Sequence, residues 1–111
     1  MARSDFLNPR ILTAIDASTQ PVFTRATDYP EGHVIDWHLH ARGQLVYAAH
    51  GVMMVAAGGG QWIVPSTRAI WMPAGIAHLV RCVGVVHMRS LYIRPDAAAG
   101  LPERPHAVGV S

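Results

Sequence analysis

The stretch GHVIDWHLHARGQLVYAAHG, residues 32–51, carries two histidines spaced two residues apart inside a run typical of a β-strand. Side chains at positions i and i+2 of a strand leave the same face, so His38 and His40 should point in one direction. The tight connection Ala41-Arg42-Gly43 then leads into a second apolar run that begins with Gln44. The stretch therefore predicts two short strands with two imidazoles and an amide oxygen near their connection.

The same alternation of short strands and turns extends well beyond this stretch. From Pro21 to Pro95, runs rich in Val, Ile, Trp and Tyr are separated by turns rich in Gly and Pro. Many short strands spaced in this way are typical of an all-β sandwich or barrel. We predict a small antiparallel β-barrel over residues 21–95, with a non-barrel N-terminal arm over residues 1–20 and a Pro/Ala-rich tail, the start of a linker, over residues 96–111.

Length and composition exclude several other classes of protein. The chain has 111 residues, about one domain, and half of them are hydrophobic while 14% are charged, which excludes intrinsic disorder. No apolar run reaches the roughly 20 residues of a membrane-spanning helix, and Asp5, Asn8 and Pro9 interrupt any signal peptide. The single cysteine, Cys82, excludes an internal disulfide and a zinc site of several thiolates. We expect a soluble, cytoplasmic protein with no membrane partner.

The basic residues give no footprint for nucleic acid. All nine are arginines, no two are adjacent, and the formal net charge is only +2. Proteins that bind nucleic acid usually gather their cationic side chains on one face or helix. We therefore expect no direct DNA binding by this chain.

A third histidine completes a candidate metal site. His78 follows the turn Pro73-Ala74-Gly75 and begins another predicted strand. In a closed barrel, His38, His40, Gln44 and His78 would supply three nitrogens and one oxygen, and would leave coordination positions free. The alternative is a set of strand histidines that hydrogen-bond within the barrel and bind nothing.

Both halves of this pattern resemble the motifs of the cupin superfamily. Gly32, His38, His40, Gln44 and Gly51 have the spacing of the first motif, with Gln44 at the position of its usual Glu. The second motif is matched by Thr67, Pro73, Gly75, His78 and Cys82, where Thr67 replaces Gly and Cys82 replaces Asn. The resemblance implies a small double-stranded β-helix, the cupin or jelly-roll barrel.

The sequence around the motifs resembles a narrower family. The phrases HLHARGQLVYAAHGVM, VPSTRAIWMPAGIAH and MRSLYIRP are similar to the N-terminal sensor domain of AraC-type transcription regulators. The resemblance implies a small-molecule effector, a homodimer, and DNA binding by a C-terminal region that this sequence does not contain. Two alternatives stay open at this point: a sensor domain taken from a longer regulator, or a stand-alone relative.

The metal and the ligand pocket follow as expectations. Three neutral imidazoles suit Zn, Ni, Fe or Cu better than Ca or Mg, which prefer oxygen ligands. Because Gln44 is neutral where the family has a carboxylate, the site is either occupied with weakened affinity or empty. Five further side chains are candidates for a ligand pocket, with core or dimer-interface packing as the alternative. They are Tyr47, His50, Met53, Trp62 and Trp71.

These features favour sensing over catalysis. No Asp or Glu occurs between Asp36 and Asp96, so nearly the whole barrel lacks a carboxylate for general acid/base chemistry, and we assign no catalytic residue. We predict a ligand-sensing and dimerisation domain of an AraC-type regulator. The alternative is a stand-alone metal-dependent cupin enzyme, similar to a dioxygenase or an isomerase. The mean hydropathy of +0.20 and the three Trp and five Met support a homodimer, because so small a barrel cannot bury all its apolar surface.

Overall fold

Seven strands make up most of the computed structural model, which describes residues 14–15 and 17–110. Every strand pair in it is antiparallel, which confirms the predicted all-β class. Most of the predicted N-terminal arm, residues 1–13 and 16, lies outside the described residues. The strands are β1 (Val22–Tyr29), β2 (Val34–His38), β3 (Gly43–Ala57), β4 (Gly60–Val64), β5 (Arg68–Met72), β6 (His78–Ile93) and β7 (His106–Gly109).

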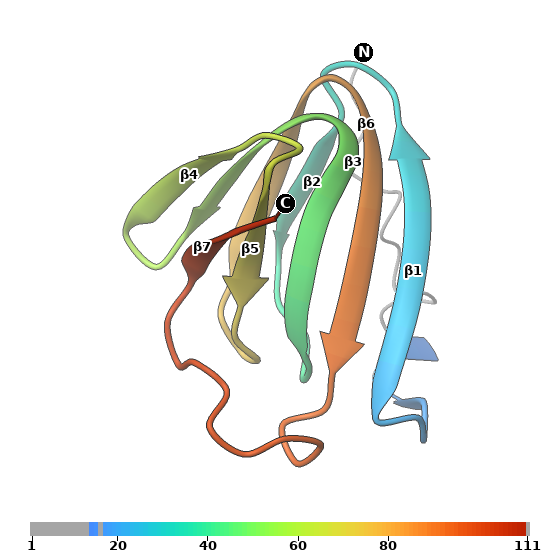
Figure 1. Ribbon diagram of the computed structural model, residues 1–111, viewed down its shortest axis with the longest axis vertical. Coiled ribbons are helices and arrows are strands. Elements are labelled where there is room, and N and C mark those ends of the chain that lie inside the picture. The colour runs from blue at the N-terminus through green and yellow to red at the C-terminus, as the bar shows by residue number, and fades with distance from the viewer. Residues whose placement is uncertain (1–13, 16, 111) are drawn as a thin grey trace.

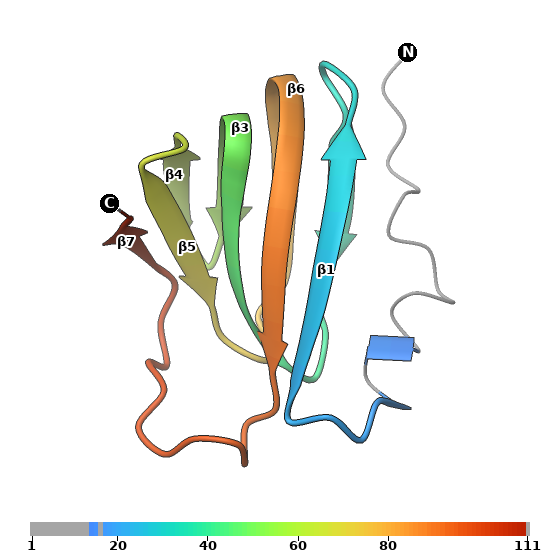
Figure 2. The same ribbon diagram turned by 45° about the vertical axis from the view of Figure 1, so that its right-hand side comes forward.

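The frame of the fold is a long two-stranded ribbon that bends over on itself. β3 has 15 residues and β6 has 16, and they pair from Gly43 opposite Ile93 to Ala57 opposite His78. Figures 1 and 2 show both strands curving over at the top, so that each contributes to a front and a back layer. β1 and β5 extend the front layer, while β2 and β4 pair with the other halves of β6 and β3. A functional site can therefore form between two layers that share the same strands.

A glycine permits the bend in β3. The register of the β3–β6 pair shifts on either side of His50, and Gly51 follows with φ at 90°. Residues with a side chain rarely adopt this left-handed region. A Cβ at Gly51 would also overlap the backbone oxygen of Val85 on the facing strand. The ribbon can bend this tightly because position 51 has no side chain.

The core lies between the two layers and is apolar. Alternate residues of β3 and β6 point into it, as the period of a strand requires. Each large aliphatic or aromatic side chain buried here contributes about 1.5–3 kcal/mol of hydrophobic stabilisation. The buried cluster comprises Tyr29, Ile35, Val46, Ala48, Met53, Val55, Ala57, Val64, Ile70, Met72, Val80, Cys82, Val86 and Met88.

The stretch 96–111, expected to be a tail, contributes a strand. β7 pairs with the free edge of β5, from Arg68 opposite Gly109 to Trp71 opposite His106. This pairing satisfies backbone groups that an edge strand would otherwise leave to water. The connecting segment is tied to the barrel by the indole of Trp71, whose Nε1 donates to the backbone oxygen of Pro102 at 2.8 Å.

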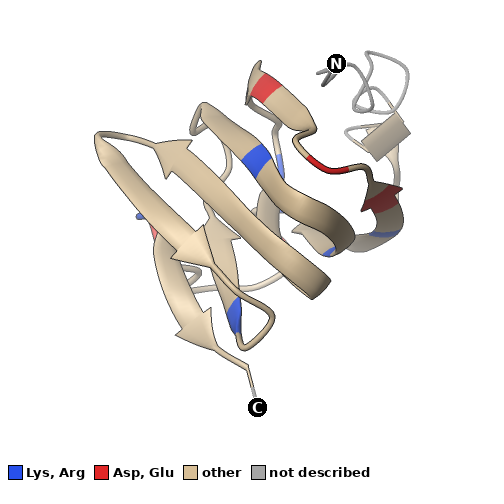
Figure 3. Cartoon of the chain, turned by 90° about the horizontal axis from the view of Figure 1, so that it is seen from above, with Lys and Arg blue, Asp and Glu red and all other residues tan. Residues whose placement is uncertain are grey.

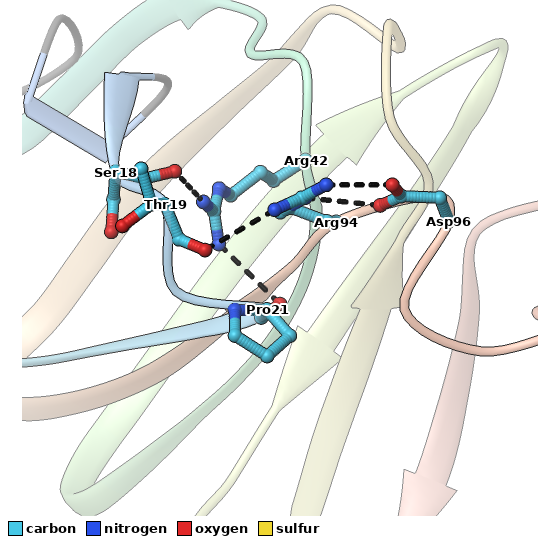
Figure 4. Close-up of polar contacts among 6 residues, drawn as sticks. All are labelled: Ser18, Thr19, Pro21, Arg42, Arg94 and Asp96. Atoms are coloured by element: carbon cyan, nitrogen blue, oxygen red, sulfur yellow. Dashed lines mark hydrogen bonds and ion pairs between the residues drawn. The ribbon is translucent and has the colours of Figure 1, made fainter.

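A buried arginine ties the segment before β1 to the barrel. Arg42 is 2% exposed, and its guanidinium donates to backbone oxygens at 2.7 Å for Ser18 and at 3.4 Å for Pro21 and Tyr92. Figure 4 shows the side chain reaching into the loop formed by the N-terminal segment. Among the described residues, the acceptors of this guanidinium are three backbone carbonyls. Arg42 therefore fixes the path of the chain that enters β1.

Arg94 supports the same loop from the surface. Its Nη1 donates to the backbone oxygen of Thr19 at 3.2 Å, and its backbone N–H donates to Pro21 at 3.0 Å. The guanidinium also forms an ion pair with Asp96, with Nη2 at 2.6 Å from Oδ2 (Figure 4). Since both side chains are exposed, this pair contributes less than the buried Arg42 contacts.

Candidate metal centre

Three histidines meet at one end of the space between the layers. His38 ends β2 and is the register partner of His78, the first residue of β6, while His40 lies in the loop that leads to β3. The ring centroids of His38 and His78 are 4.3 Å apart, and that of His40 lies 5.7 Å and 5.2 Å from them. One ring nitrogen from each histidine lies within 4.8 Å of the other two. The structure thus brings the three predicted imidazoles together.

Backbone carbonyls set the orientation of all three rings. In each histidine, Nδ1 lies within hydrogen-bond distance of a carbonyl oxygen two residues away. Because a carbonyl can only accept, each Nδ1 carries the proton and each Nε2 keeps its lone pair. This tautomer, with its second nitrogen held by a protein acceptor, is the usual one for a metal-binding histidine. The distances are 2.7 Å from His38 to Asp36, 2.8 Å from His40 to Arg42, and 2.9 Å from His78 to Ile76.

Gln44 completes the predicted donor set. Its amide nitrogen donates to Ser90 Oγ at 3.0 Å and to the Tyr92 hydroxyl at 3.2 Å, and these bonds assign the amide orientation. Its Oε1 then lies 3.2 Å from Nε2 of His40. Two lone pairs face each other at this distance, an arrangement that a cation between them would stabilise.

Burial leaves one of the imidazole nitrogens without a partner. Nε2 of His78 is fully buried and has no hydrogen-bond partner in the described structure. A buried polar atom that stays unpaired costs roughly 1–3 kcal/mol, so such an atom calls for an explanation. A metal ion bound at Nε2 is the explanation that the neighbouring donors fit. The residues present therefore suit a divalent ion held by His38, His40, His78 and Gln44.

The same burial favours the neutral form of His38 and His78. Desolvation, and after it the charge on His38, lowers the pKa of His78 to about 3. Desolvation is also the main cause that lowers the pKa of His38, partly offset by its hydrogen bond to the Asp36 carbonyl. Imidazole binds metals only in its neutral form, so these side chains are ready for an ion at neutral pH.

The five residues predicted to line a ligand pocket do not come together. Met53 is fully buried in the core, and Trp62 packs against that core beside a cavity of about 450 Å³ that Ile76 also lines. Tyr47 lies instead in a groove of about 310 Å³ on the outer face of the front layer. His50 is exposed at the bend, and Trp71 packs over Gly43 under the C-terminal segment.

Three residues of the site and its surroundings were not predicted from the sequence. Ser90 and Tyr92 hold the Gln44 amide, and the Tyr92 ring lies 5.2 Å from the ring of His40. Alternation along β6 places both on the inner face, but only the register with β3 puts Tyr92 opposite Gln44 and Ser90 opposite Val46, two residues along. Arg42 gave no signal at all, because a single arginine beside a turn is usually exposed.

Comparison with protein families matches residues 20–108, most of the chain, to the AraC-like ligand binding domain. The chain belongs to the AraC-like ligand binding domain family. A stretch of 60 residues, 54% of this chain, is 33% identical to the HTH-type transcriptional regulator NimR of Escherichia coli K12. The match spans 22% of NimR, so the matched stretch corresponds to about a fifth of that regulator. Both findings confirm the AraC-type resemblance.

Solved structures confirm the cupin fold of this AraC-like domain. A cupin superfamily protein from Desulfitobacterium hafniense superposes with a TM-score of 0.63 at 15% identity, over 70% of this chain and 72% of that protein. Oxalate decarboxylase from Bacillus subtilis, described with Mn(II) centres, gives a TM-score of 0.62 at 14% identity, over 77% of this chain and 23% of the enzyme. At these identities the likeness is one of fold. Within the described part of the chain, no helix has the length and apolarity needed to cross a membrane.

Proposed function

We propose that this AraC-like ligand binding domain senses a small molecule through a metal ion held by His38, His40, His78 and the amide oxygen of Gln44. The observation that carries the proposal is the convergence of three neutral imidazoles, each with Nδ1 on a carbonyl, within a domain of a ligand-binding family. Such an ion supplies open coordination positions for an oxygen- or nitrogen-bearing effector.

The donor set favours a borderline transition metal. Three imidazole nitrogens and one neutral oxygen suit Zn²⁺, Ni²⁺, Fe²⁺ or Cu²⁺ better than Ca²⁺ or Mg²⁺. The neutral amide at position 44 supports modest affinity, which suits reversible loading. Trp62 and Ile76, beside the cavity at the β3–β4 hairpin, are available to contact the apolar part of an effector.

Sensing requires a change that reaches the rest of the protein. We propose that the effector binds two conformations of the domain with different affinity and so shifts their populations. The Arg42 side chain is placed to take part, since its own carbonyl holds His40 while its guanidinium holds the segment before β1. In the longer regulators of this type, that shift would alter a separate DNA-binding region. Because transcription regulators act on DNA inside the cell, we also propose that the protein is cytoplasmic.

The metal proposal is tested by elemental analysis of protein purified without a His-tag. Wild type should carry or take up about one transition-metal ion per chain, and His38→Ala and His78→Ala should each lose it. Metal content should fall as the pH drops below about 6, because protonated imidazole does not bind metal. If metal survives both alanine variants, the ion is bound elsewhere, and if wild type takes up none at micromolar supply, the site is empty.

A metal-dependent enzyme could use the same four residues, so a second experiment must distinguish catalysis from sensing. The oxalate decarboxylase fold makes catalysis the second candidate, whereas the barrel strands contain no carboxylate from position 37 to 95. Metal-loaded protein should bind effector analogues in a thermal-shift screen without consuming oxygen or releasing product. Turnover that disappears in His78→Ala would support the enzyme instead.

We also propose that the chain forms homodimers and does not bind DNA by itself. Several large apolar side chains are exposed among the described residues, with Trp37 at 57% and Ile63 at 64%. Basic segments are scattered rather than grouped in the view of Figure 3. Sedimentation should give twice the 12.0 kDa monomer mass at tens of micromolar, and only monomer there would count against the dimer. A gel shift at about 50 mM salt should give no sequence-dependent band. Because low salt strengthens protein–DNA binding, this condition would reveal even a weak complex.

A further inference from the structure

A second pair of histidines lies on the outer surface, at the bend of the long ribbon. His50 of β3 and His87 of β6 are direct cross-strand partners in the register. Their ring centroids are 5.1 Å apart and the rings are tilted by 38°. His50 is exposed and His87 is half-buried, so neither ring is locked in the core. This pair is on the opposite side of the sheet from the imidazoles of the inner site.

The spacing of the pair fits chelation by two imidazoles. Side chains directly opposite each other on antiparallel strands have Cβ atoms about 4.5–5.5 Å apart, close enough for both rings to reach one ion. Exposed rings move between staggered rotamers at little cost, so their nitrogens can adjust to the ion. Imidazole is a ligand for Zn, Cu and Ni, whereas no thiolate is near to favour a softer metal.

The neighbours of the pair define how many ligands the chain supplies. Asp28 of β1 is the register partner of His87, but its carboxylate is paired with Arg89 at 3.3 Å. Arg89 therefore competes for this carboxylate, and we assign only the two imidazoles of the described residues to the site. A site with two protein ligands and water in the other positions binds more weakly than the inner site with three imidazoles.

We propose that His50 and His87 form a second transition-metal site that links β3 to β6 where their register shifts. An ion here would join the two strands on either side of the bend and hold its curvature. The site is independent of whether the inner three-histidine site is occupied, because the two sets share no residue.

The test is a titration with Cu²⁺ and with Zn²⁺ in protein whose inner site is disabled by His38→Ala and His78→Ala. This background should carry no metal as purified, but on titration at higher metal concentration it should bind one ion weakly. Adding either His50→Gln or His87→Gln should raise the Kd for that ion at least about tenfold, about 1.4 kcal/mol. His106→Gln is the matched control, since it removes one exposed histidine that lies on another strand, β7, and contacts the carbonyl of Arg104.

A second readout keeps the result clear if the background variant is unstable. In the wild-type chain, the titration should show a second, weaker ion that His50→Gln and His87→Gln each remove while the first ion stays. Nuclear magnetic resonance should report Cu²⁺ broadening at His50 and His87 together. Loss of the ion in only one of the two variants, an equal loss in His106→Gln, or no second ion at millimolar supply would overturn the proposal. None of these outcomes tests the inner site. If the inner site does not bind metal, the wild-type titration lacks the first, tighter ion.

Discussion

Nε2 of His40 lies 3.2 Å from Oε1 of Gln44, with the His40 proton held on the other side of the ring by the Arg42 carbonyl. In the tautomer with the proton on Nδ1, two acceptors face each other at this distance, and a cation bound to both would remove their repulsion. The tautomer of His40 therefore decides whether its Nε2 and the Gln44 oxygen are both available to bind a metal ion. The contact also makes position 44 the most direct place to change metal affinity.

Gln44→Glu should tighten metal binding. The substitution keeps the length of the side chain and adds a formal negative charge beside a divalent ion, so we expect Kd to fall about tenfold or more, which is about 1.4 kcal/mol. Isothermal titration with Zn²⁺ or Ni²⁺ measures the change. Gln44→Met, which removes the oxygen at similar volume, should weaken binding. A folded Gln44→Glu protein with unchanged or weaker affinity would remove Gln44 from the ligand set.

The metal-free domain should lose stability in mild acid. Burial lowers the pKa of His78 to about 3, whereas the unfolded imidazole titrates near 6.5. Between these values the unfolded chain binds a proton that the folded chain does not, so stability falls as the pH drops below about 6.5 and stops falling near 3. At pH 5 the loss from this group should be about 1–2 kcal/mol.

Urea unfolding in the presence of a chelator checks this pH dependence. His78→Gln should be less stable at pH 7 but show a flatter profile from pH 7 to pH 5. His106→Gln, which removes an exposed histidine, should keep the wild-type slope. If His78→Gln keeps that slope too, the buried imidazole is not the group that titrates.

Arg42→Met should release the segment before β1. The substitution leaves the carbonyls of Ser18, Pro21 and Tyr92 without their shared donor, and we expect a loss of about 1–3 kcal/mol in the free energy of unfolding. Limited proteolysis before Val22 should become faster. Arg94→Met removes an exposed arginine from the same loop and should cost less than about 1 kcal/mol. Equal losses for the two substitutions would mean that burial does not increase the contribution of Arg42 to the free energy of unfolding.

Gly51→Ala should be far more damaging than Gly84→Ala. Both glycines have positive φ, but a Cβ at position 51 would overlap the oxygen of Val85, whereas nothing lies within 4 Å of one at position 84. We expect about 1 kcal/mol for the backbone conformation at Gly84, and at least twice that at Gly51 because the strands must also separate. Chemical denaturation measures both. Similar losses would show that the bend can open without cost.

The sequence alone determined the class of fold and singled out the residues of the candidate metal site. Short β-rich runs between Gly and Pro turns specify strands through local preferences, and residues 38 and 40 share a face because the strand period is two. His78 could be added to them only because its spacing after Pro73 and Gly75 resembles a known motif. In each case the information is local in the chain.

Tertiary structure alone decided which residues of distant strands meet and where the alternation along a strand is interrupted. Tyr47 and Gln44 lie three residues apart on β3, so the strand period alone places them on opposite faces, but only the fold shows that one face lines the outer groove and the other the inner site. His50 is exposed because the register shifts around it at the bend, a change that simple alternation from Gln44 does not predict. Tyr92 and Arg42 meet their partners across 48 and 24 residues of chain, at Gln44 and Ser18. Such contacts depend on strand register and on the bend at Gly51, and both are set by the packing of the two layers rather than by the nearby residues.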